Sequence, residues 1–362
     1  MAAPAVWKVK TAKQLYPRIC SLENLYSAAA KARKRKTRKQ YVEDFALHRE
    51  RFLAQLQDDL LSQRYCPRGY QHFYIHDPKK RLISAAPYRD RVVHHALCNV
   101  LEPIVQRRFV QDSYSCQKGK GTMAARERCR GYTNRFRYVL KCDVRKFFQS
   151  IDQKIMLEKL SRIIRCDRTV SLCSLILESY RDKEIPATIF TGDDLFSAAE
   201  RKRGLPIGNL TSQLWANCYL DHMDHYIKEE LRVPGYARYT DDWLIWSDDK
   251  GFLRFCEAAI MDLLQKERLA FNSRKTRIIK TKEGVPFLGF RFLPGKAPIV
   301  LGTTKRRFER RTRRQRMQVD KGEFSMEDMK RSVFGWVQFS RYGNVTGLLA
   351  AYGQRGFGLA GT

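Results

Sequence analysis

Three aspartates stand in otherwise apolar segments of this sequence, where carboxylates can bind cations. Asp241 and Asp242 lie side by side in "RYTDDWLIW" (238–246), a stretch that otherwise predicts a buried β-hairpin. Asp143 follows the apolar run of "YVLKCDV" (138–144). Two carboxylates about 4 Å apart repel by roughly 4 kcal/mol at an effective dielectric of about 20. Either a cation therefore neutralises the doublet or the side chains face water, as they would if each aspartate only capped a turn.

The strands that carry these carboxylates are expected to be neighbours in one sheet. Asp143 and the doublet would then converge as an oxygen-rich site for hard divalent cations, with Mg²⁺ preferred and Mn²⁺ as a substitute. Two such ions support phosphoryl transfer, because one activates an attacking 3′-hydroxyl and the other holds a triphosphate and its leaving group. Adjacent side chains of a strand point to opposite faces, so a tight turn is needed for both doublet carboxylates to reach the ions. We therefore expect Asp241 to be the better ligand and Asp242 the more peripheral one.

The composition indicates a folded core and a polyanionic partner. Hydrophobic residues make up 43% of the 362 residues and aromatic residues 12%, which is enough for a core. The net charge of +31 is extreme for a folded chain, and nucleic acid is the commonest polyanion that such a surface binds. An anionic membrane is the competing partner, but no stretch reaches the roughly 18 apolar residues of a spanning helix and no signal peptide is predicted. Ten cysteines without CxxC spacing indicate reduced thiols of a cytoplasmic protein rather than zinc ligands.

Apolar periodicity and turn residues predict the elements that carry these aspartates. Strands are expected as two short strands in 73–91 joined by a turn at Asp77-Pro78, one strand at 137–144, the hairpin at 238–246, and a hairpin or strand pair at 285–293. Helices are expected as a helical pattern through Tyr41, Phe45, Phe52, Leu56 and Leu60, an amphipathic helix over 93–105, a helix after 117–121, a helix after the loop at 202–213, a helix near 251–268, and a small helical appendage in the last fifty residues.

The ordered set of motifs over residues 70–295 resembles that of reverse transcriptases. "YTDD" (239–242) resembles their YxDD box, and "DVRKFFQSI" (143–151) is similar to their first catalytic motif. Further matches are "KKRLISAAPYRDRVVHHAL" (79–97) to the fingers segment, "SYSCQKGKGTMAA" (113–125) to the block that follows it, and "NSRKT" (272–276) and "FLGFRF" (287–292) to the later palm motifs. The resemblance implies an RNA-directed DNA polymerase, a nucleotidyltransferase with two Mg²⁺ ions, and adds the backbone carbonyl of Val144 to the metal ligands.

The same resemblance implies an α+β right-hand polymerase fold. A basic N-terminal extension is expected over 1–40 and fingers over 41–135. A ferredoxin-like antiparallel palm, with room for fingers insertions, is expected over 136–297. A helical basic thumb is expected over 298–362.

One loop resembles that of a particular subtype of reverse transcriptase. Most reverse transcriptases carry a QGxxxSP pattern where this chain has "IGNLTSQ" (207–213), with Ile207 for the glutamine and Gln213 for the proline. The variant resembles the reverse transcriptases of diversity-generating retroelements, which copy a template-repeat RNA with frequent errors at adenine in mutagenic retrohoming. The resemblance implies template RNA, cDNA and dNTPs as ligands, and an accessory variability protein, a pentameric ring, as partner.

The family motifs assign further roles near the aspartates. Phe148 stands where the family carries the steric gate against ribonucleotides, although an ordinary core phenylalanine beside Phe147 is the alternative. Lys275 matches the late palm lysine that protonates the leaving pyrophosphate, but Arg274 and Lys280 are near enough to be confused with it.

Substrate contacts are expected from the fingers and from the variant loop. Lys80, Arg81 and Arg89 are cations suited to triphosphate oxygens, with Arg81 the best match, and each could instead be a surface charge. Ile207 and Gln213 are the fidelity candidates, because an apolar side chain in place of an amide removes a hydrogen bond near the new base pair. The alternative for Ile207 is that it only packs the loop.

Two basic runs flank the predicted polymerase core. "KARKRKTRKQ" (31–40) holds seven Lys and Arg in ten residues, and "KRRFERRTRRQR" (305–316) holds eight in twelve. We expect both to bind phosphate backbone or the accessory protein, with solvated helix faces as the alternative. Phe308 and Trp336 could stack on nucleic acid or pack within the protein.

Two pairs of histidines could suggest metal sites. His94-His95 and the pair His222 and His225 lack a matching Cys or carboxylate cluster, so we expect core or surface histidines.

Two kinds of alternative function remain open. The chain could be a retron-, group II intron- or defence-type reverse transcriptase, which is distinguished from the retroelement enzyme by whether errors concentrate at adenine. It could also be a non-catalytic RNA-binding scaffold, which a primer-extension assay would distinguish from a polymerase.

Overall fold

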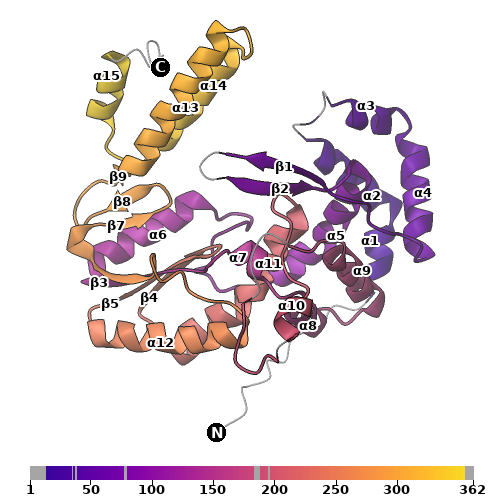
Figure 1. Cartoon of the computed structure of the whole chain (residues 1–362), viewed down its shortest axis with the longest axis horizontal. Coiled ribbons are helices and arrows are strands. Elements are labelled where there is room, and N and C mark those ends of the chain that lie inside the picture. The colour runs from indigo at the N-terminus through magenta and orange to yellow at the C-terminus, as the bar shows by residue number, and fades with distance from the viewer. Residues whose placement is uncertain are drawn as a thin grey trace. The chain divides into compact units, whose positions relative to one another are not determined.

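The computed structural model (Figure 1) describes residues 14–34, 36, 39–76, 80–182, 188–194 and 196–354. The predicted turn at Asp77-Pro78, residues 1–13, 35, 37 and 38 of the extension over 1–40, and the end of the predicted thumb lie outside these residues. The chain divides into two compact units. The first unit consists of Met1–Lys118, Asp143–Arg232 and Ala258–Asn272, and the second of Gly119–Cys142, Val233–Glu257 and Ser273–Thr362. Helices and strands are mixed, as the α+β expectation requires, while the division into fingers, palm and thumb stays a prediction.

The first unit is mainly helical. Its elements are α1 (Leu15–Cys20), α2 (Leu22–Arg33), α3 (Gln40–Leu47), α4 (Arg49–Leu61), β1 (Gln71–Ile75), β2 (Arg81–Ala85), α5 (Tyr88–Gln106), α7 (Phe147–Ser150), α8 (Gln153–Ile163), α9 (Asp167–Glu178), α10 (Ser197–Glu200), α11 (Leu210–His225) and a π-helical turn at Tyr226–Glu230. Helix α12 (Lys250–Lys266) begins in the second unit and ends in the first.

Helix α5 is the centre of the first unit, and its sequence pattern explains why. Val93, Leu97, Val100 and Leu101 recur at the three- and four-residue spacing of one helix face, and all are buried. This face packs against α2, α11 and α1. The prediction of an amphipathic helix over 93–105 is confirmed.

His94 lies on the same helix and is only 2% exposed. Burial, together with the charges of His95 and Arg91, lowers the pKa of His94 to about 3. His94 is therefore a core histidine, as expected. Seven of the ten cysteine thiols are buried, whereas Cys66 and Cys116 are exposed and Cys166 is half-buried.

The single helical pattern expected from Tyr41 to Leu60 was wrong in one respect. The chain forms two helices, α3 and α4, that meet at His48, whose φ of −114° and ψ of 28° are not helical. The break changes the buried face, so that Tyr41 and Phe52 are 42% and 41% exposed. The ring of Phe52 stacks on the ring of Phe45 at a centroid distance of 5.3 Å. Phe52 is the ring of this pair that faces solvent.

The second unit holds both larger sheets. Its elements are α6 (Thr122–Arg135), β3 (Tyr138–Asp143, of which Asp143 opens a segment of the first unit), β4 (Gly235–Tyr239), β5 (Asp242–Ser247), β6 (Arg277–Lys280), a 3₁₀ turn at Thr281–Glu283, β7 (Val285–Phe287), β8 (Phe290–Phe292), β9 (Ile299–Val300), α13 (Gly302–Asp320), α14 (Met326–Ser340) and α15 (Thr346–Gln354). One sheet has the order β4-β5-β3-β6 and the other the order β7-β8-β9.

Antiparallel pairing holds the four-stranded sheet together. β4 pairs with β5 and β3 pairs with β6, both antiparallel, as the predicted hairpin and strand require. Residues 243–246 of β5 are fully buried, so both faces of this strand are covered, and α6 packs on β4 and β5. Gly235 lies so close to its neighbour that a Cβ atom would come within 2.9 Å of the Trp246 Cβ. The paired strand end therefore requires glycine there.

A buried arginine joins α6 to the three-stranded sheet and to α14. Arg126 is 4% exposed, and its guanidinium donates to the Leu288 carbonyl at 3.0 Å. It also stacks over the rings of Phe290, Phe339 and Tyr342 at 4.6, 4.7 and 5.2 Å from their centroids. Stacked cation–π contacts of a desolvated guanidinium stabilise by about 0.5–2 kcal/mol each, so this residue fixes α14 to β8.

Helices α13 to α15 form the C-terminal appendage that the sequence predicts. The Phe308 ring stacks on Trp336 at a centroid distance of 3.9 Å and an interplanar angle of 13°, and Tyr352 packs beside them at 5.5 Å from Phe308. Both stacked residues are buried. They therefore pack within the protein rather than presenting rings to a ligand. Within the part of the chain that the structure describes, no helix combines the length and the apolarity needed to cross a membrane.

Candidate active site

The Asp143 carboxylate ends β3 and is held by a neighbouring segment of the first unit. The Asn272 side-chain amide donates to Oδ2 of Asp143 at 3.1 Å, and the Asn272 backbone N–H donates to the Asp143 carbonyl at 2.7 Å. Val144 bridges to Phe271, and the Arg145 N–H donates to the Ala270 carbonyl at 2.8 Å. Together these bonds pair residues 143–145 with residues 270–272 in an antiparallel arrangement. They orient the half-buried Asp143 carboxylate.

The chain turns sharply after this pairing. Lys146 adopts a left-handed conformation with φ of 45° and begins the short helix α7. Phe147 is 2% exposed, whereas Phe148 is only half-buried. The Phe148 carbonyl accepts from the Leu205 N–H at 2.7 Å, which fixes this backbone against the loop at 202–209. The two adjacent phenylalanines thus have different environments, and only Phe147 is a fully buried core residue.

The aspartate doublet lies at the tip of the β4–β5 hairpin in the second unit. Tyr239 pairs with Asp242 across the strands, and Thr240 makes the turn with φ of +58°. This is the tight turn that the sequence requires, with Asp241 in the turn and Asp242 at the start of β5. β5 lies next to β3 in the sheet, so the prediction that the strands carrying the three aspartates are neighbours is confirmed.

A lysine supplies part of the positive charge that the doublet requires. Nζ of Lys141, on β3, lies 2.8 Å from Oδ1 and 3.0 Å from Oδ2 of Asp242 and also donates to the Pro286 carbonyl at 3.0 Å. Lys141 is two residues before Asp143, and strand residues two apart share one face. No role was expected for Lys141 from the sequence, although its spacing from Asp143 was the available signal.

Metal binding by these carboxylates stays a prediction. Over the described ranges, no group of three or more His, Cys, Asp or Glu side chains is assembled as a metal site. The side chains of Asp143, Asp241 and Asp242 are half-buried and offer the oxygen donors that Mg²⁺ prefers.

The variant loop packs on the β1–β2 hairpin within the first unit. The Ser84 N–H of β2 donates to the Ile207 carbonyl at 3.2 Å, and Gly208 has a φ of +111° that favours glycine. The Ile207 side chain is half-buried. Gln213 is exposed on the first turn of α11, where its Oε1 accepts from the thiol of Cys116 at 3.4 Å.

The three cations predicted to contact the triphosphate differ in their partners. Lys80 is exposed and lies 4.2 Å from the centroid of the Tyr74 ring. Arg81 is exposed at the start of β2. Arg89 is half-buried in an ion pair with Asp59 at 2.8 Å, so its charge already has a partner in the fold.

Lys275 and the two cations that could be confused with it lie at or before β6 in the second unit. Lys275 and Arg274 are exposed ahead of the strand, and Lys280 is exposed at its end. Burial alone therefore does not distinguish Lys275 from the two alternatives.

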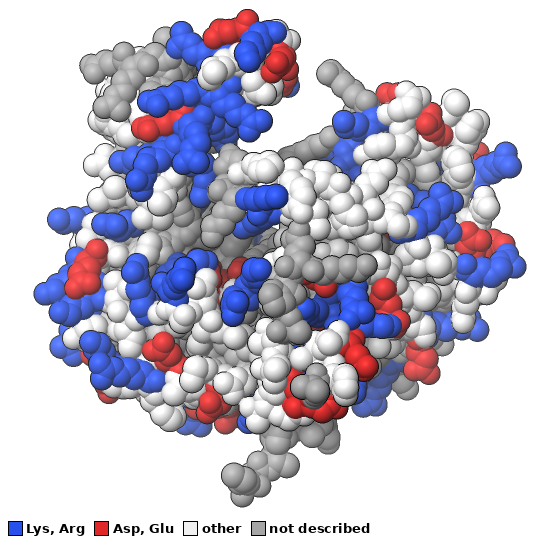
Figure 2. Space-filling view, viewed as in Figure 1, with Lys and Arg blue, Asp and Glu red and all other residues white. Residues whose placement is uncertain are grey.

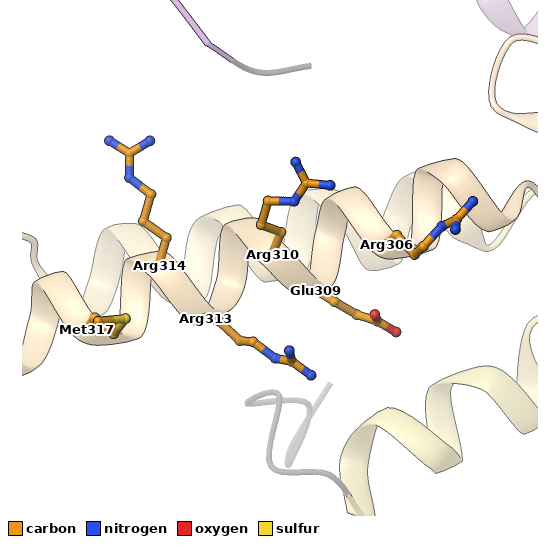
Figure 3. A pocket seen from close by; sticks show the side chains of 6 residues that line it. All are labelled: Arg306, Glu309, Arg310, Arg313, Arg314 and Met317. Carbon is orange, nitrogen blue, oxygen red and sulfur yellow. The ribbon is translucent and has the colours of Figure 1, made fainter. Parts of the chain in front are cut away.

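The second basic run lies in α13, whose exposed positions carry most of its arginines. Figure 2 shows Lys and Arg side chains gathered over this helix. Arg306, Arg310, Arg313 and Arg314 line a shallow hollow along the helix together with Glu309 and Met317 (Figure 3). Arg310 and Arg314 project from one side of the helix, and Arg313 and Glu309 from the other. The first basic run lies partly outside the described residues.

The histidine pair near the end of α11 has carboxylate partners. His225 contacts Glu229 at 2.7 Å and Asp221 at 3.6 Å, and His222 lies 3.6 Å from Glu267. Both are partly exposed. Both are surface histidines, and both have carboxylate neighbours that the sequence did not indicate.

Comparison with known proteins identifies the family. A family model described as reverse transcriptase (RNA-dependent DNA polymerase) matches residues 76–292, which is more than half of the chain. The chain therefore belongs to the reverse transcriptase family, and the expectation of an RNA-directed DNA polymerase is confirmed at the level of the family.

Individual relatives are more distant. The chain is 25% identical over 279 residues to Protein YkfC of Escherichia coli (strain K12), covering 66% of this chain and 70% of that protein. It is also similar to apo telomerase from Candida tropicalis, with 13% identity, a TM-score of 0.43 and coverage of 66% of this chain and 51% of that one. Telomerase from Candida albicans in complex with a fragment of telomeric RNA gives 13% identity, a TM-score of 0.44 and coverage of 66% and 46%. The chain thus spans about half the length of these telomerase chains.

The Asn272 amide generates a first prediction. Asn272→Ala should lower the primer-extension rate about tenfold, because a hydrogen bond to a charged group contributes about 1.5–3 kcal/mol and 1.4 kcal/mol corresponds to a factor of ten. Asn272→Asp should lower it further by placing a second negative charge beside Asp143. Single-turnover extension at several Mg²⁺ concentrations measures both. Asn134→Ala, which changes an exposed amide, is the control, and an unchanged rate in Asn272→Ala would contradict the orienting role.

Proposed function

We propose that this chain is the RNA-directed DNA polymerase of a diversity-generating retroelement, which makes error-prone cDNA from a template-repeat RNA. The observation that supports the polymerase is the family match over 76–292, a range that contains Asp143 and the doublet on neighbouring strands of one sheet. The subtype rests on "IGNLTSQ" (207–213) in place of the common motif.

The proposed metal ligands are the carboxylates of Asp143, Asp241 and Asp242 and the carbonyl of Val144. When bound, two Mg²⁺ ions would lower the pKa of a primer 3′-hydroxyl and neutralise charge on the triphosphate. The chain itself contributes orientation, because Asn272 holds the Asp143 carboxylate and Lys141 engages Asp242. These contacts fix where the oxygen donors point before any substrate binds.

Substrate contacts are proposed from exposed cations and from the half-buried loop. Arg81 and Lys80 are exposed and suited to triphosphate oxygens, whereas Arg89 is paired with Asp59. Lys275 is proposed to protonate the leaving pyrophosphate. A raised KM for dNTP in Arg81→Ala, and a lowered kcat in Lys275→Ala with no similar change in Arg274→Ala, are the measurements that test these roles.

The arginine face of α13 is proposed to contact the phosphate backbone of template or cDNA. Arg306, Arg310, Arg313 and Arg314 present four guanidinium groups along one helix, and Arg groups pair well with phosphate oxygens. The salt dependence of RNA binding measures how many such contacts form. The accessory ring protein remains a proposed partner for the same basic surfaces.

Primer extension tests the polymerase proposal. The purified chain with an RNA template, a DNA primer, dNTPs and Mg²⁺ should extend the primer, and removal of Mg²⁺ by EDTA should stop extension. Asp143→Asn or Asp241→Asn should lower the rate on the order of a thousandfold, since charge stabilisation by bound metals contributes several kcal/mol.

Asp248→Asn is the matched control, because Asp248 follows the other end of β5 and pairs with Arg137 at the surface. Full extension by Asp143→Asn would contradict the proposal. RNA binding without any extension by the unchanged chain would favour the scaffold alternative.

The half-buried Phe148 is proposed as the gate that excludes ribonucleotides. A ring under the incoming sugar occupies the volume of a 2′-hydroxyl, so Phe148→Ala should raise the rNTP to dNTP incorporation ratio at least tenfold, within the about 1–3 kcal/mol typical of such discrimination. Competition assays with both nucleotides measure the ratio. Phe255→Ala, at an exposed position on α12, is the control. An unchanged ratio in Phe148→Ala would remove the gate assignment.

Sequencing of the cDNA separates the retroelement subtype from the retron-, group II intron- and defence-type alternatives. Errors should concentrate opposite template adenine, and Ile207→Gln should lower them severalfold by restoring an amide near the nascent pair. Ile207→Val, which keeps an apolar side chain, should retain the errors. Errors spread evenly over the four template bases, or an identical spectrum in Ile207→Gln, would count against the subtype.

A further inference from the structure

A small basic hollow in the first unit has no role in the function proposed above. It is lined by five cationic side chains together with Ser150, Thr188, Phe190 and Ala270, and its cations are Arg145, Lys146, Arg201, Arg203 and Arg268. The described lining includes no Asp or Glu. We propose that this hollow is a binding site for a single phosphate group.

The size of the hollow favours a small oxyanion over a whole nucleotide. Its cavity volume is about 40 Å³, where a single water molecule needs roughly 10–15 Å³. It therefore has room for a few water molecules or one phosphate-sized group. A sugar and a base would remain outside it.

A buried carboxylate holds two of the arginines in place. Asp152, whose side chain is 1% exposed, lies 2.6 Å from Nη1 of Arg268 and 3.4 Å from Nε of Arg201. The same carboxylate accepts from the backbone N–H groups of Lys154 and Ile155 at the start of α8. Its position is thus fixed by the helix, and the two guanidinium groups are fixed by it. Preorganised donors lose little freedom when a ligand binds.

Other contacts fix the rest of the lining. Arg201 also pairs with Asp193 and is only 5% exposed. The backbone of Arg203 bridges to Asp152, and its carbonyl accepts from the Asp182 N–H at 2.9 Å. The backbone of Arg145 is held through its N–H to the Ala270 carbonyl, and its side chain is exposed. The hollow is therefore formed by backbone pairing and buried ion pairs rather than by surface side chains alone.

Cations outnumber the described acidic groups around the hollow. Five cations line it, and the described carboxylates behind them are Asp152, Asp182 and Asp193. This excess of described positive charge favours an anionic ligand. Burial, together with the charges of Arg201 and Arg181, lowers the pKa of Arg203 although Asp182 opposes this. A bound anion would relieve that crowding of like charges.

The phosphate could be inorganic, as phosphate or pyrophosphate, or belong to a nucleic-acid backbone. Both sources present the same oxygens to the arginines. Because the hollow borders the turn at 144–150 that carries Phe148, its occupation would brace that turn. The test of this site measures anion binding and not polymerisation. Absence of binding would therefore leave the polymerase proposal unaffected.

Site-resolved arginine modification tests the proposal with the full chain. Inorganic phosphate or pyrophosphate should protect Arg145 and Arg203 from phenylglyoxal, measured by mass spectrometry, at least fivefold more than Arg165, an exposed arginine of the same unit. A short single-stranded oligonucleotide is the second probe. Protection by the inorganic anions identifies a free phosphate site, and protection by the oligonucleotide alone identifies a backbone phosphate site.

Paired variants with a folding control distinguish a loss of binding from a loss of structure. Arg203→Gln should weaken binding of the protecting probe about tenfold, whereas Arg203→Lys should retain most of it and Arg165→Gln should leave it unchanged. Circular dichroism reports whether each variant is folded. The proposal is overturned if neither probe protects Arg145 and Arg203 beyond Arg165, or if Arg203→Gln and Arg165→Gln bind the probes equally.

Discussion

The neutralisation of carboxylates at the ends of two neighbouring strands is the constraint on which the candidate active site depends. β3 and β5 are neighbours in one sheet, β3 ends at Asp143, and β5 begins at Asp242. Lys141 pairs with Asp242 and Asn272 donates to Asp143. These two contacts lower the electrostatic cost of keeping the carboxylates half-buried and fix their orientation, as the proposed metal site would require.

Elsewhere in the chain the signs of the charges are reversed, because positive side chains cluster and a carboxylate holds some of them in place. Helix α13 carries exposed arginines, and it also buries Phe308 against Trp336. In the basic hollow, Asp152 holds Arg201 and Arg268 close together although the two guanidinium groups repel. Such clusters of like charge are the basis on which anionic ligands are proposed for both places.

Much of the local structure follows from sequence patterns, and the departures have identifiable physical causes. The hairpins and helix α5 are set by strong periodicity and turn residues, so their prediction succeeded. The break at His48 was missed because both α3 and α4 continue a helical spacing, and only tertiary packing selects the face that each buries. The Phe308–Trp336 stack was left open because the sequence does not say whether an aromatic ring on a basic helix faces the core or a ligand.

The residues whose roles could not be predicted from the sequence are those whose partners lie far away in the chain. Asn272 lies within a motif that the sequence analysis used, but its bond to Asp143 depends on how the segment after α12 returns to β3. Arg126 reads as one more basic residue among 69 Lys and Arg, and only the fold shows that aromatic rings enclose it. Such contacts leave no local pattern, because they join residues more than a hundred positions apart.

Iron-mediated backbone cleavage tests most directly whether Asp143 and the 241–242 doublet share bound metal ions. With Fe²⁺ in place of Mg²⁺, primer–template present and peroxide added, the account predicts cuts in both 142–146 and 239–243, and Asp143→Asn should abolish both together. Cleavage confined to one segment, or cleavage at 239–243 that persists undiminished in Asp143→Asn, would contradict it.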